Sequence, residues 1–354
     1  MIFTDLFQQH VYNFNVGQCI VEGLFYHGTL FLFVAGALLF WNQRRAVASC
    51  FVIAGLLLGG LGADMIWYEP YALVVEHYTI ETPKLKKPLR VVFVADIQTD
   101  RIGWYEERTL KKIQAQQGDI IILGGDYLQT FPGMPHADKL PEQFRQLFIR
   151  HKLEAPLGVY AIKGNIGVSN EEIVLFKDTG VDEITSSTVF ENLGGDKGIG
   201  PIDFVVLGLG DSRGSAGDPK ELSETGNFMI MAGHYPNFAI HGYRSGPSEN
   251  YDKPGYMSAK SAPDLMLCGH THGGQVSIPF YGTMTWGGDH HIRQMPREMM
   301  SGFFQFANGG RLLVSRGTGM ECGWAPRIRF NCPSEISVID LIPEHVGTAN
   351  STAN

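Results

Sequence analysis

The segment from residue 265 to residue 275 reads LMLCGHTHGGQ: a short apolar run, a glycine, and two histidines one residue apart. Short, continuously apolar runs are typical of strands that are covered on both faces. His270 and His272 follow the run at once, and Gly273 and Gly274 allow the backbone to turn tightly after them. This His-x-His pair is the most specific motif in the chain. It predicts a loop in which ligands for a metal ion gather.

Four other short apolar runs also end on a polar residue. They are followed by Asp96 in VADIQ, Asp126 in GGDY, Asn165 in KGNIG and His234 in AGHYPN. A single Asp or His after a strand is usually a cap or a turn residue. In an open α/β sheet, however, the ligand crevice lies at the carboxyl ends of the strands, so an ordered set of such residues can converge.

The rest of the segment 89–341 continues the alternation of apolar runs and helical stretches, which favours an α/β domain. Strands are predicted at 89–95, 120–123, 159–162, 204–207, 229–231, 265–267, 312–314 and 336–341. Helices are predicted at 104–117, 141–152 and 170–178. We expect one domain over 88–345, followed by a flexible tail at 346–354.

The chemistry of the strand-end residues is coherent. Carboxylate and amide oxygens together with imidazoles suit Mn, Fe or Zn, and a carboxylate can bridge two ions. Two divalent ions about 3.5–4 Å apart can hold both the attacking and the leaving oxygen of a phosphoryl displacement. The sequence therefore predicts a metal-dependent phosphoester chemistry at these strand ends.

The series VADIQ, GGDY, KGNIG, AGHYPN and CGHTHGGQ resembles the calcineurin-like metallophosphoesterase superfamily over residues 89–342. Residues 314–341, VSRGTGMECGWAPRIRFNCPSEISVIDL, resemble the end of its membrane-associated bacterial branch, which includes phosphohydrolases that act on lipid-linked substrates. The resemblance implies a sandwich of two central β-sheets with flanking helices. It also implies a binuclear metal centre at which metal-bound water attacks phosphorus.

The resemblance also assigns the ligands by position. Asp126 would bridge the two ions, Asp96, Gln98 and His272 would complete one site, and Asn165, His234 and His270 would complete the other. Of these, Asp126, Asn165 and His234 are the residues that it places closest to the catalytic step.

Two positions depart from the family pattern. The family usually has Asp-x-His where this chain has Asp96-Ile97-Gln98, so an imidazole ligand is replaced by an amide and metal binding there should weaken. The family also has Asn-His-Asp where this chain has Asn165-Ile166-Gly167, so the histidine that stabilises the transition state or protonates the leaving group is missing. General acid catalysis is worth about 10²–10⁴-fold, so the activity is expected to be reduced.

Other side chains could replace the missing proton donor. His136 lies in the loop TFPGMPHAD, and His290 and His291 lie in a glycine-rich loop; an ordinary surface histidine is the alternative for each. Arg316 could contact a substrate phosphate, and a structural salt bridge is the alternative for it.

The charge and the cysteines exclude other classes of protein. The net charge is -8, so a nucleic acid is not an expected partner. The five cysteines form no CxxC motif, which argues against a cysteine zinc site. Cys322 and Cys332 could pair in an oxidising compartment or could be two ordinary thiols.

An N-terminal segment, 1–23, precedes two apolar runs at 24–41 and 46–68, each close to the ~20 residues that cross a bilayer. A two-helix transmembrane hairpin is therefore predicted at 24–68, with a linker at 69–87 and the lipid bilayer as a partner. Arg44 and Arg45 are the only basic residues between the runs, and no Lys or Arg precedes the first run. The positive-inside rule then places the domain on the outer, periplasmic face of the inner membrane, although Lys84, Lys86, Lys87 and Arg90 counter it.

These observations predict a membrane-anchored phosphohydrolase with two divalent ions, which cleaves a phosphoester or pyrophosphate bond of a lipid-linked or amphiphilic substrate. The alternative is a catalytically weakened or inactive metal-binding scaffold protein of the same fold.

Overall fold

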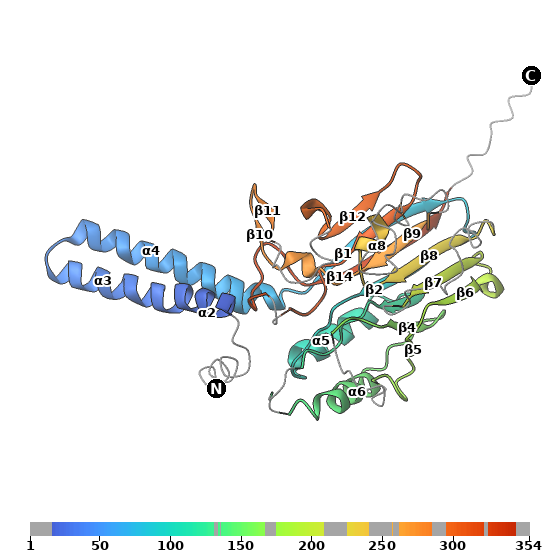
Figure 1. The fold of residues 1–354 in the computed structure, drawn as a ribbon, viewed down its shortest axis with the longest axis horizontal. Coiled ribbons are helices and arrows are strands. Elements are labelled where there is room, and N and C mark those ends of the chain that lie inside the picture. The colour runs from blue at the N-terminus through green and yellow to red at the C-terminus, as the bar shows by residue number, and fades with distance from the viewer. Residues whose placement is uncertain are drawn as a thin grey trace, which may run out of the picture.

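Two apolar helical arms form an antiparallel hairpin that projects from an α/β domain (Figure 1). The computed structural model describes residues 16–130, 134, 136–166, 175–208, 225–240, 257, 262–284, 295–321 and 325–344. The first arm contains α2 (Val16–Glu22), one π-helical stretch η1 (Gly23–Gly28) and α3 (Thr29–Trp41), and the second contains α4 (Arg45–Ala63), η2 (Asp64–Tyr68) and η3 (Glu69–Tyr71). By length and composition, both arms could cross a membrane.

Small residues allow the two arms to pack closely. A Cβ atom at Gly62 would lie 2.8 Å from the ring of Phe25, and one at Gly55 would lie 3.1 Å from the ring of Phe33. Large apolar side chains on the outer side of both arms are exposed, among them Leu30, Phe31, Val34, Leu38, Ile53, Leu56 and Leu57. Glycines inside and leucines outside are typical of helices that pack in lipid.

The domain is a sandwich of two sheets, each of six strands. The first has the order β1 (Val74–Thr82), β14 (Glu335–Pro343), β2 (Leu89–Val94), β3 (Ile120–Leu123), β4 (Val159–Ile162) and β5 (Asp182–Ile184). The second has the order β12 (Gly302–Gln305), β13 (Arg311–Val314), β9 (Leu265–Cys268), β8 (Phe228–Gly233), β7 (Ile202–Leu207) and β6 (Thr188–Leu193). The inner pairs of both sheets are parallel, except that β14 runs antiparallel to β2.

Three apolar layers hold the sandwich together. Phe93 and Ile122 of the first sheet and Leu267 of the second belong to the cluster between the sheets. A second cluster packs α5 (Trp104–Gln114) and α6 (Leu140–Arg150) on the outer face of the first sheet, and a third packs α8 (Asn237–Ile240) on the second. Burial on both faces explains why the central strands are continuously apolar. The predicted fold class is confirmed.

The structure corrects the predicted linker at 69–87. Residues 74–82 of this segment form β1, which pairs with β14 in parallel register from Val74 to Thr82. All eight predicted strands form, at 89–95, 120–123, 159–162, 204–207, 229–231, 265–267, 312–314 and 336–341. The predicted helices at 104–117 and 141–152 also form. Most of the predicted helix at 170–178 and the tail at 346–354 lie outside the described residues.

The base of the helical hairpin is packed against the domain. Phe25 and Met65, one from each arm, share an apolar cluster with Val276 and Ile328 of the domain. The backbone N–H of Arg329 donates to the carbonyl oxygen of Met65 over 3.0 Å. These contacts join the hairpin to the segments that follow β9 and precede β14.

Candidate metal centre

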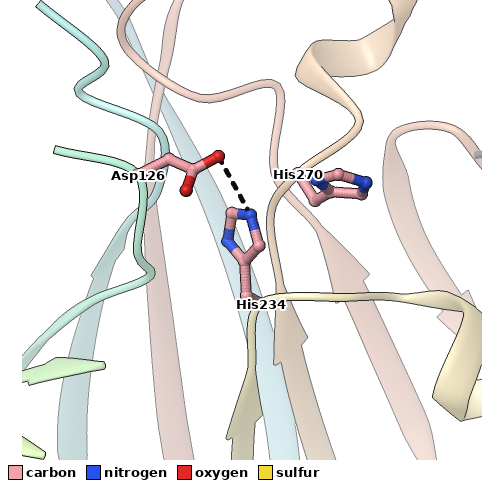
Figure 2. A group of neighbouring side chains, drawn as sticks. All are labelled: Asp126, His234 and His270. Atoms are coloured by element: carbon pink, nitrogen blue, oxygen red, sulfur yellow. Dashed lines mark ion pairs between the residues drawn. The ribbon is translucent and has the colours of Figure 1, made fainter. Parts of the chain in front are cut away.

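The predicted strand-end residues meet at one edge of the two sheets. Asp96 follows β2 and Asp126 follows β3 of the first sheet, while His234 and His270 follow β8 and β9 of the second. Figure 2 shows the carboxylate of Asp126 and the imidazoles of His234 and His270 gathered between these strand ends. One ligand atom of each of the three lies within 4.8 Å of the others, and all three residues are buried. This spacing fits a divalent ion.

Three contacts fix the imidazole of His234. Its Nδ1 donates to the carbonyl oxygen of Gly124 over 2.9 Å. Its Nε2 lies 2.7 Å from Oδ1 of Asn165 and 3.1 Å from Oδ2 of Asp126. A histidine that ligates a metal usually donates its other ring N–H to a backbone carbonyl in this way, which fixes the tautomer.

The charges of the site depend on one another. Burial and the nearby Asp126 carboxylate raise the pKa of Asp96 to about 7, although the attraction of His234 opposes them. Burial opposes a charge on His234, but the Asp126 and Asp96 carboxylates raise its pKa to about 9. For Asp126, the same imidazolium outweighs burial and lowers the pKa. A proton on His234 therefore offsets part of the negative charge here, and a divalent ion would offset more of it.

Asp96 and His272, predicted to hold the other ion, lie next to each other. The Asp96 carboxylate accepts the backbone N–H of His270 at 3.1 and 2.9 Å and lies 4.0 Å from Nε2 of His272. Burial and the charge of Arg329 lower the pKa of His272 to about 3. Its imidazole is therefore neutral, which is the form that binds metals. Within the described part of the chain, its buried Nδ1 has no hydrogen-bond partner.

The hydrogen bonds of the Gln98 amide are made by its nitrogen and not by its oxygen. Its Nε2 donates to Oε2 of Glu321 over 2.7 Å and to Oε1 of Gln129. Its Oε1 is buried and, among the residues that the structure describes, accepts no hydrogen bond. Because a carbonyl oxygen is an acceptable ligand for Mn or Fe, the residues present fit a metal at this position too.

The loop after β4 completes the centre next to Asp126. The backbone N–H of Ile166 donates to Oδ1 of Asp126 over 2.7 Å, and the side chain of Ile166 is half-buried. A Cβ atom at Gly164 would lie 2.1 Å from both N and Oδ1 of Asp126, so this position requires glycine. Asn165 itself is exposed, although its side chain reaches His234.

The backbone is unusual at the ligand positions. The φ angles are +50° at Asp96, +52° at Asp126, +71° at His270 and +50° at His272. Non-glycine residues rarely adopt this left-handed conformation, and such residues cluster at functional sites. Each strand therefore ends in a sharp turn that directs a ligand into the site.

Sequence reasoning missed three residues around the centre: Gln129, Glu321 and Arg329. Arg329 is fully buried and donates to the carbonyl oxygens of Arg316, Gly319 and Cys332. The loop that it holds packs on Asp96, since the N–H of Gly319 donates to the Asp96 carbonyl over 2.7 Å. All three residues are brought in from loops, where no periodic pattern marks them.

The remaining expectations fall outside this cluster. The guanidinium of Arg316 lies 2.7 Å from Glu76 and 3.0 Å from Glu335, so it makes the salt bridges of the structural alternative, and contact with substrate stays a prediction. His136 is exposed in the turn before α6, and its role as an acid also stays a prediction. The pair 290–291 and Cys322, the suggested partner of Cys332, lie outside the described residues.

Comparison with known proteins agrees with this geometry. The model of the calcineurin-like phosphoesterase family matches residues 89–274, which include the five strand ends with the predicted ligands. The chain belongs to this family. It is therefore a metal-dependent phosphoester hydrolase by descent.

Several bacterial proteins are similar to the chain. An uncharacterized metallophosphoesterase of Campylobacter jejuni is 26% identical over 75% of this chain and 63% of its own length. The phosphodiesterase YaeI of Escherichia coli is 24% identical over 78% of this chain and 89% of its own. The UDP-2,3-diacylglucosamine pyrophosphatase LpxG of Chlamydia trachomatis is 33% identical, over 39% of this chain and 37% of its own.

Proposed function

We propose that this metallophosphoesterase is anchored in a membrane by its helical hairpin and hydrolyses a phosphoester or pyrophosphate bond in a lipid-linked or amphiphilic molecule. The observation that carries the proposal is the shared cluster at the base of the hairpin. Val276, which packs against Phe25 and Met65, comes only a few residues after the predicted ligand His272. A phosphate held at the bilayer surface would therefore lie close to the metal centre, and tethering raises the local concentration of such a substrate.

The chain's own side chains have distinct tasks in this reaction. Asp126 would bridge two divalent ions, with Asp96, Gln98 and His272 on one and Asn165, His234 and His270 on the other. When bound, such ions supply Lewis acidity to the phosphoryl oxygens and make water more acidic. Gly124 keeps the ligand nitrogen of His234 directed at Asp126, and Gln129 and Glu321 keep the oxygen of Gln98 free.

Two relatives support the substrate class. LpxG is named for a diacylated sugar nucleotide and YaeI for a phosphodiester. The basic pair Arg44 and Arg45 supports a position in the inner membrane with the domain on the outer face. A reaction on a UDP-diacylglucosamine type of molecule requires a cytoplasmic active site. The similarity to LpxG therefore favours a substrate on the cytoplasmic side, whereas the basic pair favours one on the outer side.

The full chain, reconstituted in phospholipid vesicles with Mn²⁺, tests the proposal. We expect it to release phosphate or a phosphorylated product from lipid phosphates or lipid pyrophosphates in the same vesicles. Asp126→Asn should abolish the release, because it removes the charge of the bridging carboxylate. Hydrolysis of a soluble aryl phosphate with none of any vesicle lipid would contradict the lipid substrate while leaving the enzyme class intact.

A further inference from the structure

A small β-hairpin that begins five residues after the predicted ligand His272 exposes large apolar side chains. It consists of β10 (Ser277–Ile278) and β11 (Gly282–Thr283). In the turn between them Phe280 is fully exposed, while Tyr281 is 56% and Ile278 40% exposed. Single exposed apolar residues are normal, but three in one short turn indicate a surface that meets an apolar partner.

Both ends of this β-hairpin are fixed at the base of the helical hairpin. Val276 precedes β10 and Met284 follows β11, and both belong to the cluster of Phe25 and Met65. The N–H of Met284 donates to the carbonyl oxygen of Val276 over 2.8 Å and closes the β-hairpin there. Figure 1 shows β10 and β11 next to the end of α4, running across the direction of the helices.

Other exposed aromatic side chains lie at the same junction. Trp67 and Tyr68 end η2 of the second helical arm and are exposed. Trp104, also exposed, contacts Tyr71 with ring centroids 5.6 Å apart. The guanidinium of Arg297 lies 4.8 Å from the ring centroid of Tyr281. Aromatic rings and Arg side chains together are typical of the headgroup region of a bilayer.

We propose that the turn Ile278–Tyr281 enters the interfacial region of the bilayer beside the helical hairpin, as a second membrane contact. The inference rests on the membrane anchoring in the proposed function. Because β10 and β11 rise only about 3.3 Å per residue from a cluster shared with the membrane arms, the turn lies close to the bilayer surface. A single tether permits the domain to tilt, whereas two contacts hold the metal centre, which lies next to Val276, against the membrane.

Fluorescence of the full chain in phosphatidylcholine and phosphatidylglycerol vesicles tests this contact. Phe280→Trp is compared with the wild-type chain, and the difference spectrum reports the new indole. We expect a blue-shifted emission that is quenched by lipids with brominated acyl chains and shielded from aqueous iodide. The matched control is Ile149→Trp on α6, because Ile149 is exposed and α6 lies away from β10 and β11 (Figure 1). Its emission should stay red-shifted and quenchable by iodide.

Three results would overturn the inference. One is a Phe280→Trp signal as open to iodide as that of Ile149→Trp. Another is shielding that persists in detergent and grows with protein concentration, which would assign the turn to contact with a second copy. The third is a chain that remains in the aqueous phase without detergent, because the membrane anchor would then be absent.

Turnover separates this inference from the proposed function. The double variant Phe280→Ser with Tyr281→Ser should reduce hydrolysis of vesicle lipids and leave that of a soluble aryl phosphate unchanged. Equal loss on both substrates would contradict a role in membrane docking. Bromolipid quenching of Phe280→Trp without hydrolysis of any lipid phosphate would support the contact and reject the substrate class. Lipid hydrolysis without bromolipid quenching would support the substrate class and reject the contact.

Discussion

At the scale of single residues, the proton on His234 controls how the metal-free centre responds to pH. The pKa of His234 is raised to about 9 by the surrounding carboxylates, although burial opposes this. Because the folded-state pKa lies above the usual value near 6.5, the stabilisation is fully present below about pH 6.5 and is lost as the pH rises through about 9. The pKa of Asp96 is raised to about 7, so its contribution to stability is also lost as the pH rises, in a lower range that ends near pH 7.

We therefore expect the melting temperature of the metal-free chain to fall between pH 7 and pH 9. Mn²⁺ affinity should rise over the same window, because the ion must displace the proton on His234. Calorimetric titrations in buffers with different ionisation enthalpies measure the proton release. His234→Gln should abolish the release in this window, and an affinity that does not change with pH in the wild-type chain would contradict the assignment.

Gln98 is a predicted ligand of the first metal site, and its Nε2 donates to Glu321 over 2.7 Å. Gln98→His should strengthen metal binding, because an imidazole is the better ligand for Mn, Fe or Zn and can donate its other N–H to Glu321. Glu321→Leu should weaken binding by about 10–100-fold, the usual effect of removing such a supporting contact. Metal stoichiometry and Kd after dialysis measure both, and a tighter site in Glu321→Leu would rule out the supporting role.

Position 166 is the place to restore the missing acid. The backbone N–H of Ile166 donates to the Asp126 carboxylate, so a side chain at this position starts next to the ligand that bridges the ions. Ile166→His should raise kcat on alkyl phosphates more than on aryl phosphates, whose leaving groups need little protonation. A well-placed acid gives about 10²–10⁴-fold. Ile166→Gln is the matched control without an acid, and an equal gain on both substrates would contradict proton transfer.

At the scale of secondary-structure elements, the central strands and the convergence of the strand-end residues could be predicted, and the sheet edges could not. Strands such as β3 are buried on both faces and therefore read as unbroken apolar runs. β1 was missed because it is an edge strand, only partly buried, in which Glu76 and His77 interrupt the apolar pattern. Glu321 was missed because it reaches Gln98 from a loop 223 residues away along the chain, and sequence periodicity carries no information about such contacts.

The role of β1 can be tested with two truncated chains. One begins at Glu69 and the other at Pro88, the start of the domain expected from the sequence. The longer chain should fold, because it keeps β1 and the buried Glu69 carboxylate that accepts the backbone N–H groups of Asn331 and Cys332. The shorter chain loses the core residue Ile80 and exposes the edge of β14.

We expect the chain that begins at Pro88 to melt well below the chain that begins at Glu69, or to aggregate. Losing a buried Ile side chain alone costs about 2–5 kcal/mol. Circular dichroism measures the difference. A mild detergent is needed because both truncated chains expose the apolar surface that Phe25 and Met65 cover in the full chain. Ile80→Ala in the full chain isolates the packing contribution. Equal melting temperatures for the two truncated chains would show that β1 adds nothing to the fold.

At the scale of the whole molecule, the proposed membrane anchor would set on which side of the membrane the chemistry occurs. The two arms are antiparallel, so the domain stands at one end of the hairpin and the short connection before α4 stands at the other (Figure 1). If both arms span the bilayer, the domain and this connection must lie on opposite sides. The positive-inside rule then compares Arg44 and Arg45 with the basic residues that follow β1.

The side of the membrane is the remaining prediction. Arg44 and Arg45 lie directly at the end of an arm. The basic residues from Lys84 to Arg90 are separated from the second arm by β1, and they follow Tyr71 by 13 to 19 residues, toward the outer limit of about 15–20 residues within which charge counts. We therefore expect an alkaline phosphatase fused to the C-terminus, which is active only outside the cytoplasm, to be active. Changing Arg44 and Arg45 together to Glu should reduce that activity, while changing both to Lys should preserve it. A fusion that is inactive in the parent chain, with fluorescence of a cytoplasmic reporter in its place, would invert the orientation. The metal centre would then face the cytoplasm, where a UDP-diacylglucosamine type of substrate becomes accessible to it.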